Sequence, residues 1–272
     1  MLFYLKNKIL FLASFMLYLI SNYMEEIKMN FEELTLINNS NDLKSFVDKE
    51  IANAINNTEH ENVIGWENIL PHKGFIDSNT RISNVDSDWI ISDNNYAYYF
   101  FDGLRKCEIK SISDALNKVY PFTMFYFGEY TNPEIREQII MNTPLRKMID
   151  ISSLAGKNTA ICVERAAIVQ NLVTLLGVES YFVVGNIHAK DEQGPHAYNI
   201  LRVNEKFYLY DVSKDIQVEI NGRIKYQPYI KAINIEQVQT LFNAGQINTG
   251  DRTYDSFGKY NIQINEEGKK IR

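Results

Sequence analysis

The sequence predicts an α+β fold in which a helix that carries a cysteine packs on an antiparallel sheet. Residues 160–176 are almost continuously apolar and rich in good helix formers, which predicts a largely buried helix. The apolar period then changes to two in residues 179–185, 196–203 and 206–212, whose β-branched and aromatic side chains predict strands. A short turn joins the last two strands, as in an antiparallel hairpin.

The cysteine lies at a position in its helix that affects its chemistry. Cys162 falls in the first turn of the predicted helix, where Asn158 or Thr159 is expected to supply the N-cap oxygen. Gly177 is expected to take the left-handed conformation that ends a helix. Unpaired backbone N–H groups and the positive end of the helix dipole both favour the thiolate, which is the nucleophilic form of cysteine. Cys162 is therefore a candidate nucleophile.

The predicted hairpin brings a histidine and an aspartate to one end of the sheet. His196 begins one strand and Asp211 ends its antiparallel partner. With the helix packed on this sheet, a thiol, an imidazole and a carboxylate converge as a nucleophile, its base and an orienting group. The competing candidate for the base is His188, which lies near the start of a polar loop predicted over residues 186–195.

The three motifs together resemble those of the transglutaminase-like superfamily, which has a papain-like Cys-His-Asp fold. They are CVERA from Cys162, HAYN from His196 and FYLYD ending at Asp211. The resemblance implies that Cys162 is the nucleophile, His196 the general base and acid, and Asp211 the carboxylate that orients the imidazole. Tyr198 stands where the family usually has Trp, and Val163 stands where the protein-crosslinking members have Trp. The resemblance therefore does not extend to crosslinking.

The resemblance implies a cysteine hydrolase, a protease or amidase that cleaves a peptide or protein amide through a thioester on Cys162. Two alternatives stay open: a protein-glutamine transferase or deamidase that uses the same triad, and a non-catalytic binding module on the same scaffold. An intact triad argues against the binding module, because binding does not require all three side chains. The polar loop over residues 186–195 is expected to be mobile and to admit water, which favours hydrolysis. Candidate donors for an oxyanion hole are Gln138, Asn142 and Asn158.

Composition excludes several other classes of function. The chain of 272 residues has a net charge of −6, so it lacks the basic surface of a nucleic-acid-binding protein. Its two cysteines, Cys107 and Cys162, do not make a disulfide framework, and Cys107 is interpreted as structurally incidental. The four histidines are scattered and no metal-binding spacing occurs, so we expect neither a metal nor another cofactor. The expected partner is a peptide or protein substrate, and the oligomeric state is not indicated.

Three segments are expected along the chain. Residues 1–28 form a hydrophobic N-terminal segment, residues 29–150 a helix-rich N-terminal lobe, and residues 151–265 the catalytic core. The apolar run at residues 9–20 has the length of a signal-peptide core and is too short to span a bilayer comfortably. Met24 and Met29 each begin a polar stretch typical of a cytosolic start, so we expect a cytoplasmic protein. The alternative is a protein anchored in the membrane or secreted through residues 1–23.

The remaining elements follow from periodicity and turn signals. Helices are expected at residues 41–56, 112–120 and 133–141, the last with Pro133 in its first turn. Residues 66–92 are expected to be irregular, and the aromatic stretch 96–101 to be either a buried strand or a helix. After Asp211, the expected elements are strands at 216–220 and 223–227 around an Asn221-Gly222 turn, a helix at 235–243 capped by Asn234, and a last strand at 260–264.

Overall fold

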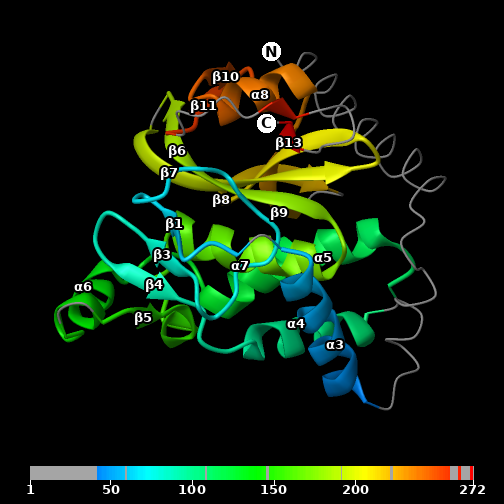
Figure 1. Cartoon of the computed structure of the whole chain (residues 1–272), viewed down its shortest axis with the longest axis vertical. Helices are drawn as coiled ribbons and strands as arrows, with labels where there is room; N and C mark the ends of the chain where they lie inside the picture. Colours follow the sequence, from blue (N-terminus) through cyan, green and yellow to red (C-terminus); the bar gives the residue numbers. More distant parts are fainter. Residues whose placement is uncertain are drawn as a thin grey trace.

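The computed structural model describes residues 42–58, 60–107, 109–144, 147–190, 192–220, 223–257, 263–264 and 270–271. The described part of the chain is a mixed α+β fold, as the sequence predicts. A large sheet lies between helix α7 (Cys162–Leu175) on one face and helix α8 (Ile235–Phe242) on the other, with the remaining helices beyond α7 (Figure 1). The hydrophobic run at residues 9–20 lies outside the described residues, as does the rest of the segment 1–28.

The large sheet is antiparallel and is built around four consecutive strands, β6 to β9, each paired with the next. Its strand order is β10-β11-β6-β7-β8-β9, with β2 also paired to β6. The strand bounds are Glu179–Ala189 for β6, Glu192–Val203 for β7, Lys206–Ile220 for β8 and Arg223–Ile233 for β9, with β2 at His72–Lys73, β10 at Gln246–Asn248 and β11 at Arg252–Asp255. Asn204 and Glu205 both have positive φ, as the type I′ turn of the predicted β7–β8 hairpin requires.

The prediction of a polar loop over residues 186–195 is wrong. The β6–β7 ladder continues through this stretch to the pair Ala189–Glu192, so residues 186–189 and 192–195 lie in two paired strands. Pro195 and Gly194 suggested a loop, yet both lie inside β7. Pairing of β7 with β8 stops at Asn199, so Pro195 has a neighbouring strand on one side and an edge on the other, where proline is tolerated.

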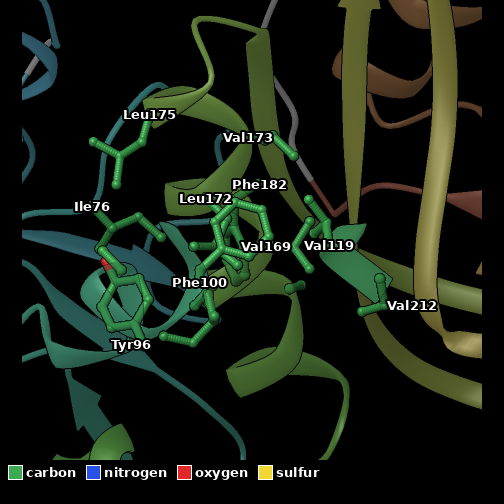
Figure 2. Packing of buried hydrophobic residues seen from close by; sticks show 14 of the residues in the cluster. Ile76, Tyr96, Phe100, Val119, Val169, Leu172, Val173, Leu175, Phe182 and Val212 are labelled. Carbon is green, nitrogen blue, oxygen red and sulfur yellow. The ribbon is translucent and has the colours of Figure 1, made fainter. Parts of the chain in front are cut away.

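One buried hydrophobic cluster joins the N-terminal helices to α7 and the sheet. Val169 and Leu172 of α7 pack among Phe100 and Val119 of the N-terminal helices and Phe182 of β6 (Figure 2). Burying large aromatic and aliphatic side chains in this way is the main favourable term in folding. Alternate residues of the strands face the opposite way, where they pack with α8; this second cluster contains Val183, Ile200, Leu209, Val238, Leu241 and Phe242.

The expected helices of the N-terminal part are present. Their bounds are Leu43–Asn56 for α3, Asn95–Arg105 for α4, Ile112–Phe127 for α5 and Pro133–Met141 for α6. The aromatic stretch 96–101 is therefore helical. Helix α5 runs beyond its expected end because Val119, Tyr120 and Thr123 stay on its buried face, while Pro121 itself is exposed.

The prediction that residues 66–92 are irregular is wrong in part. Four short strands form a second sheet in the order β1-β3-β4-β5, with β1 at Val63–Gly65, β3 at Arg81–Ser83, β4 at Asp88–Ile90 and β5 at Ile149–Asp150. Strands of two or three residues are too short to show a period in sequence. Their buried side chains, Ile82 and Trp89, hold the small sheet on the core.

After Asp211 the two strands and the helix follow in the expected order, but two strands that the sequence did not predict, β10 and β11, come after α8. Strands β8 and β9 pair up to Ile220–Arg223, while the Asn221-Gly222 turn itself lies outside the described residues. Asn234 caps α8 by accepting a hydrogen bond from the backbone N–H of Gln237 at 2.8 Å. Of the last strand expected at residues 260–264, residues 260–262 lie outside the described residues, and Gln263–Ile264 (β12) pairs with a short strand at Lys270–Ile271 (β13). Among the described residues, no helix is both long and apolar enough to cross a membrane.

Candidate active site

Helix α7 begins at Cys162, and its first turn is capped differently from the prediction. The N-cap position is Ile161, whose backbone N–H donates to Oε2 of Glu164 at 2.8 Å. Asn158 and Thr159 do not serve as caps, because both precede Ile161 and lie too early in the chain to occupy the N-cap position. The predicted end of the helix is confirmed, since Gly177 has φ 75° and directly follows the C-cap residue.

A buried ion pair fixes the first turn of α7 to α6. Nη2 of Arg136 donates to Oε1 of Glu164 at 2.9 Å, and its Nε donates to Oδ2 of Asp86 at 3.0 Å. Arg136 also donates from Nη1 to the carbonyl of Thr159 at 3.2 Å. Burial raises the pKa of Glu164, and the charge of Arg136 opposes that rise. The guanidinium therefore compensates a carboxylate that would otherwise place an unpaired buried charge beside Cys162.

His196 and Asp211 lie together inside the sheet. Nε2 of His196 and Oδ2 of Asp211 are 2.7 Å apart, and the two side chains are at most 3% exposed. His196 lies within β7, opposite Gly185 of β6, rather than at the start of the strand as predicted. Gly185 is required there because a Cβ at this position would lie 1.9 Å from the carbonyl oxygen of Asp255, the last residue of β11.

Asp211 is held by three donors. His196 and the hydroxyl of Tyr254 both donate to Oδ2, the second at 2.9 Å, and the backbone N–H of Ser213 donates to Oδ1 at 3.0 Å. Burial alone would raise the pKa of Asp211, but the positive charge of His196 and these hydrogen bonds outweigh it and lower the pKa. The carboxylate therefore stays ionised. The register of the β8–β9 ladder shifts directly after Asp211, at the place where this side chain turns inward.

The imidazole bridges the carboxylate and the thiol. Burial lowers the pKa of His196, but the charge and hydrogen bond of Asp211, together with those of Cys162, raise it to about 10. Because Nε2 is bonded to Asp211, Nδ1 is the ring nitrogen left for Cys162. At neutral pH this raised pKa favours the charged imidazolium form of His196 beside Cys162. Cys162 itself is half-buried.

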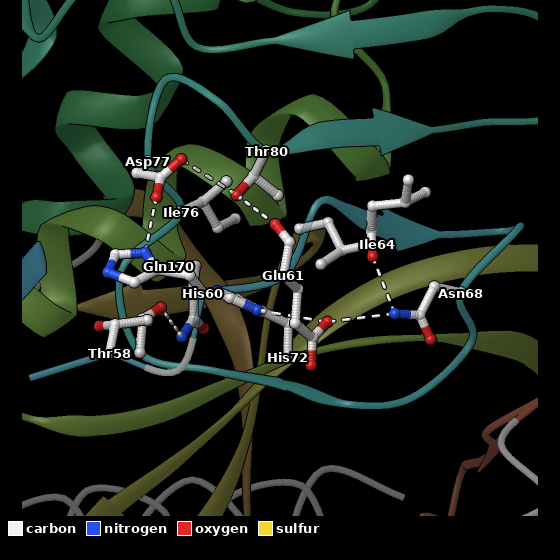
Figure 3. Close-up of polar contacts among 12 residues, drawn as sticks. Thr58, His60, Glu61, Ile64, Asn68, His72, Ile76, Asp77, Thr80 and Gln170 are labelled. Carbon is white, nitrogen blue, oxygen red and sulfur yellow. Dashed lines mark hydrogen bonds and ion pairs between the residues drawn. The ribbon is translucent and has the colours of Figure 1, made fainter.

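The other three histidines also have carboxylate partners but lie elsewhere. Nδ1 of His60 is 2.8 Å from Asp77, and Nδ1 of the buried His72 is 3.7 Å from Glu61; both belong to a polar cluster on the segment before β3 (Figure 3). Nε2 of His188, the competing candidate, is 3.5 Å from Oδ2 of Asp255. A histidine–carboxylate pair is therefore common in this molecule. Among the described residues, the His196–Asp211 pair differs from the other three because both its side chains are buried and its imidazole contacts the thiol of Cys162.

Among the described residues, no hydrogen bond or ion pair links any of the three candidate oxyanion donors to Cys162. Gln138 and Asn142 are exposed, in and directly after α6. Asn158 has a backbone role, because its carbonyl accepts hydrogen bonds from the N–H groups of Thr131 and Asn132. The backbone N–H of Cys162 is a further candidate, since the first N–H groups of a helix have no partner within the helix.

Two residues of the site were missed by sequence reasoning. Arg136 and Tyr254 lie far from the cysteine motif in sequence, and each makes its contact through tertiary structure. Arg136 looks like an ordinary polar residue of an amphipathic helix, and residues 252–255 are too short a strand to show alternation. The described residues contain no group of three or more His, Cys, Asp and Glu side chains that could hold a metal.

Comparison with known proteins gives no matching family model and no match among curated protein sequences.

Proposed function

We propose that this protein is a cysteine-dependent amide hydrolase, a protease or amidase with a transglutaminase-like core. The observation that supports it most is the buried imidazole of His196, which is bonded to Asp211 at 2.7 Å and in contact with Cys162 at the start of α7. Nucleophile, base and orienting carboxylate come from a helix and two strands, which hold them rigidly. A binding module needs no such arrangement.

The first chemical step is acylation of the thiol. The thiolate of Cys162 attacks the carbonyl carbon of the amide, and the negative charge moves to the carbonyl oxygen. The imidazolium of His196 then gives its Nδ1 proton to the amide nitrogen, the C–N bond breaks and the amine leaves. Asp211 keeps its proton-free form and holds the ring in place throughout. The products are a free amine and a thioester on Cys162.

The second step releases the acyl group. Neutral His196 accepts a proton from water at Nδ1 as the water oxygen attacks the thioester carbonyl, and the C–S bond breaks. A carboxylic acid leaves, and the thiolate–imidazolium pair is restored. Water is the default acceptor, because it is the solvent and Cys162 is half-buried rather than sealed.

The transferase or deamidase alternative uses the same thioester. The paired strands β6 and β7 extend beyond His196, where the sequence suggested a mobile loop. A rigid wall beside the base is better suited to excluding water than a loop is, which favours an amine acceptor. This observation keeps transfer to a protein amine as the second candidate function.

The acyl-enzyme is the direct test of the proposal. The protein and its Cys162→Ala variant are incubated with a complex peptide mixture, quenched in acid and analysed by mass spectrometry of the fragment containing residue 162. We expect an acyl adduct on Cys162 alone, and its mass identifies the substrate class. Two results together would rule out thiol catalysis: no adduct on Cys162 from a broad mixture, and equal amounts of the cleaved peptides with the wild type and with Cys162→Ala.

Partition of the acyl group separates the two reactions. With the peptide identified by the trapped adduct, the protein is supplied with a millimolar primary amine, and the free acid is compared with the amide adduct. The proposal predicts mainly free acid. A predominance of the amide adduct would assign the protein to the transferases.

We also place the protein in the cytoplasm, on the strength of the polar stretches that begin at Met24 and Met29. Fractionation of the native host with an antibody against the C-terminus tests this. Recovery of a membrane-bound species that retains residues 1–23 would show the alternative, an anchored protein.

A further inference from the structure

The carboxylate that orients His196 has a second buried partner that the proposed mechanism does not use. Tyr254 lies on β11 and is completely buried. Its hydroxyl donates to Oδ2 of Asp211 at 2.9 Å, and the same oxygen accepts the 2.7 Å hydrogen bond from Nε2 of His196. Two donors from neighbouring parts of the sheet therefore meet on one oxygen atom.

Other tyrosines hold the ring of Tyr254 in place. Tyr198 packs edge-on against it with ring centres 5.1 Å apart, and Tyr229 stacks on it at 6.0 Å. The hydroxyls of these two neighbours are bonded elsewhere: that of Tyr198 donates to the carbonyl of Asp255, and that of Tyr229 donates to Thr249. Within this cluster it is thus Tyr254 whose hydroxyl reaches the carboxylate of the site.

The surroundings keep the phenol of Tyr254 protonated. Burial raises its pKa, the charge of Asp211 raises it further, and the nearby guanidinium of Arg252 opposes the rise without cancelling it. Arg252 lies two residues earlier on the same face of β11, with its guanidinium 4.5 Å from the centre of the Tyr229 ring. A phenol that stays protonated can only donate to an ionised carboxylate, so the direction of this hydrogen bond is fixed.

We propose that Tyr254 is a positioning residue of the active site, which locks Asp211 in the orientation that directs Oδ2 at His196. This inference rests on the proposed function. Without the phenol, the Asp211 side chain keeps its bonds to His196 and to the Ser213 N–H but loses the donor that restrains Oδ2 from the β11 side. The imidazole then has a less firmly placed partner, and the thiolate–imidazolium pair becomes weaker.

A substrate-free measurement tests the role of Tyr254. The rate at which iodoacetamide alkylates Cys162 is measured against pH in the wild type and in Tyr254→Phe, which keeps the ring and removes the hydroxyl. We expect the rate at neutral pH to fall by about tenfold, since hydrogen bonds to charged groups are among the stronger ones. The acidic limb of the profile should move to higher pH, because the Tyr254 hydrogen bond is one of the interactions that lower the pKa of Asp211.

Tyr229→Phe is the matched control. Tyr229 lies opposite Asp211 in the β8–β9 ladder and stacks on Tyr254, but its hydroxyl is bonded to Thr249 and Asp251. We expect this variant to keep the wild-type alkylation profile. The nuclear magnetic resonance signal of the His196 Nε2 proton supplies a second readout, which should shift in Tyr254→Phe and stay in place in Tyr229→Phe.

The possible failures are distinguishable. If Tyr254→Phe keeps the wild-type rate, pH profile and proton resonance, Tyr254 has no positioning role. The same conclusion follows if Tyr254→Phe and Tyr229→Phe lower the free energy of unfolding equally and leave the pH profile of Cys162 alkylation unchanged. If wild-type Cys162 is no more reactive than Cys107, the proposed function itself has failed. A slow, shifted profile in Tyr254→Phe alone supports the inference.

Discussion

Asp211 holds the imidazole of His196 through Oδ2 at 2.7 Å, so replacing that oxygen with an amide nitrogen is an informative change. The Asp211→Asn side chain would present a donor to Nε2 and favour the wrong tautomer of the ring. The equivalent replacement in serine proteases lowers turnover by roughly 10⁴-fold, and we expect a loss of the same order here in a folded protein. Turnover of the peptide identified by the trapped adduct measures it.

His188→Ala is the control for that variant. His188 has its own partner, Asp255, and should be dispensable for turnover. Near-normal turnover of Asp211→Asn together with an inactive His188→Ala would mean that the triad is wrongly assigned.

The raised pKa of His196 predicts how stability depends on pH. In a Cys162→Ala background the imidazole keeps Asp211, its main raising partner. The folded protein then holds a proton that the unfolded chain has lost above about pH 6.5. The free energy of unfolding should therefore fall as the pH rises from about 6.5 toward the pKa of His196 in this background, which Asp211 still raises but Cys162 no longer does.

Urea unfolding at several pH values across this window measures the slope. Adding Asp211→Asn to the Cys162→Ala background should flatten it, because the charge that raises the pKa of His196 is gone. An equal slope in both proteins would show that the imidazole is not stabilised in its charged form by Asp211.

That Cys162, His196 and Asp211 lie close together could be predicted from sequence because each has a local signal. Cys162 follows a loop and opens an apolar helix, and His196 and Asp211 lie in strands joined by a recognisable turn. Tyr254 and Arg136 have no such signal, since their roles come from contacts with residues distant in the chain. A buried hydrogen-bond donor can be recognised only after the fold is known.

At the level of elements, the buried pair of Arg136 and Glu164 holds the start of α7 in place. Removing one partner leaves an uncompensated buried charge, which typically costs about 3–5 kcal/mol. We expect Arg136→Ala to lower the free energy of unfolding by about that amount and to slow alkylation of Cys162, because the first turn of its helix loses an anchor. Denaturant unfolding and iodoacetamide labelling measure the two effects.

Arg81→Ala is the matched control. Arg81 also pairs with two carboxylates, Glu67 and Asp88, but all three side chains are at least partly exposed. Exposed pairs contribute little, so this variant should lose far less stability than Arg136→Ala and should keep the reactivity of Cys162. Equal losses in the two variants would contradict a special role for the buried pair.

Element types were predictable from sequence, and element lengths were less so. The apolar period identified α7, the hairpin of β7 and β8, and the helices α3, α5 and α6. Gly194 and Pro195 are typical loop residues and therefore suggested a loop. They fit in β7 because its pairing with β8 stops at Asn199, which the sequence does not show. The predicted cap of α7 was wrong for another reason. The side chain of Glu164, at the third helical position, accepts the hydrogen bond of the Ile161 N–H, so the helix starts without a polar N-cap side chain.

For the whole molecule, the α+β class followed from the change of period, but the second small sheet did not. Its strands are two or three residues long and pair residues that are distant in sequence, such as Trp89 with Ile149. The expected helix-rich lobe therefore also contains a sheet. A shared hydrophobic cluster connects Val47 and Phe100 of that lobe to Val169 of α7. The position of the thiol thus depends on packing between that lobe and α7.

The central claim is that the fold activates Cys162, and competition between the two thiols tests it most directly. Cys107 is exposed and Cys162 is half-buried, so accessibility alone predicts faster alkylation of Cys107. Activation by His196 and the helix start predicts the reverse: at mildly acidic pH, iodoacetamide should label Cys162 at least about tenfold faster, and His196→Gln should abolish the difference. Faster labelling of Cys107 in the wild-type protein would contradict the account.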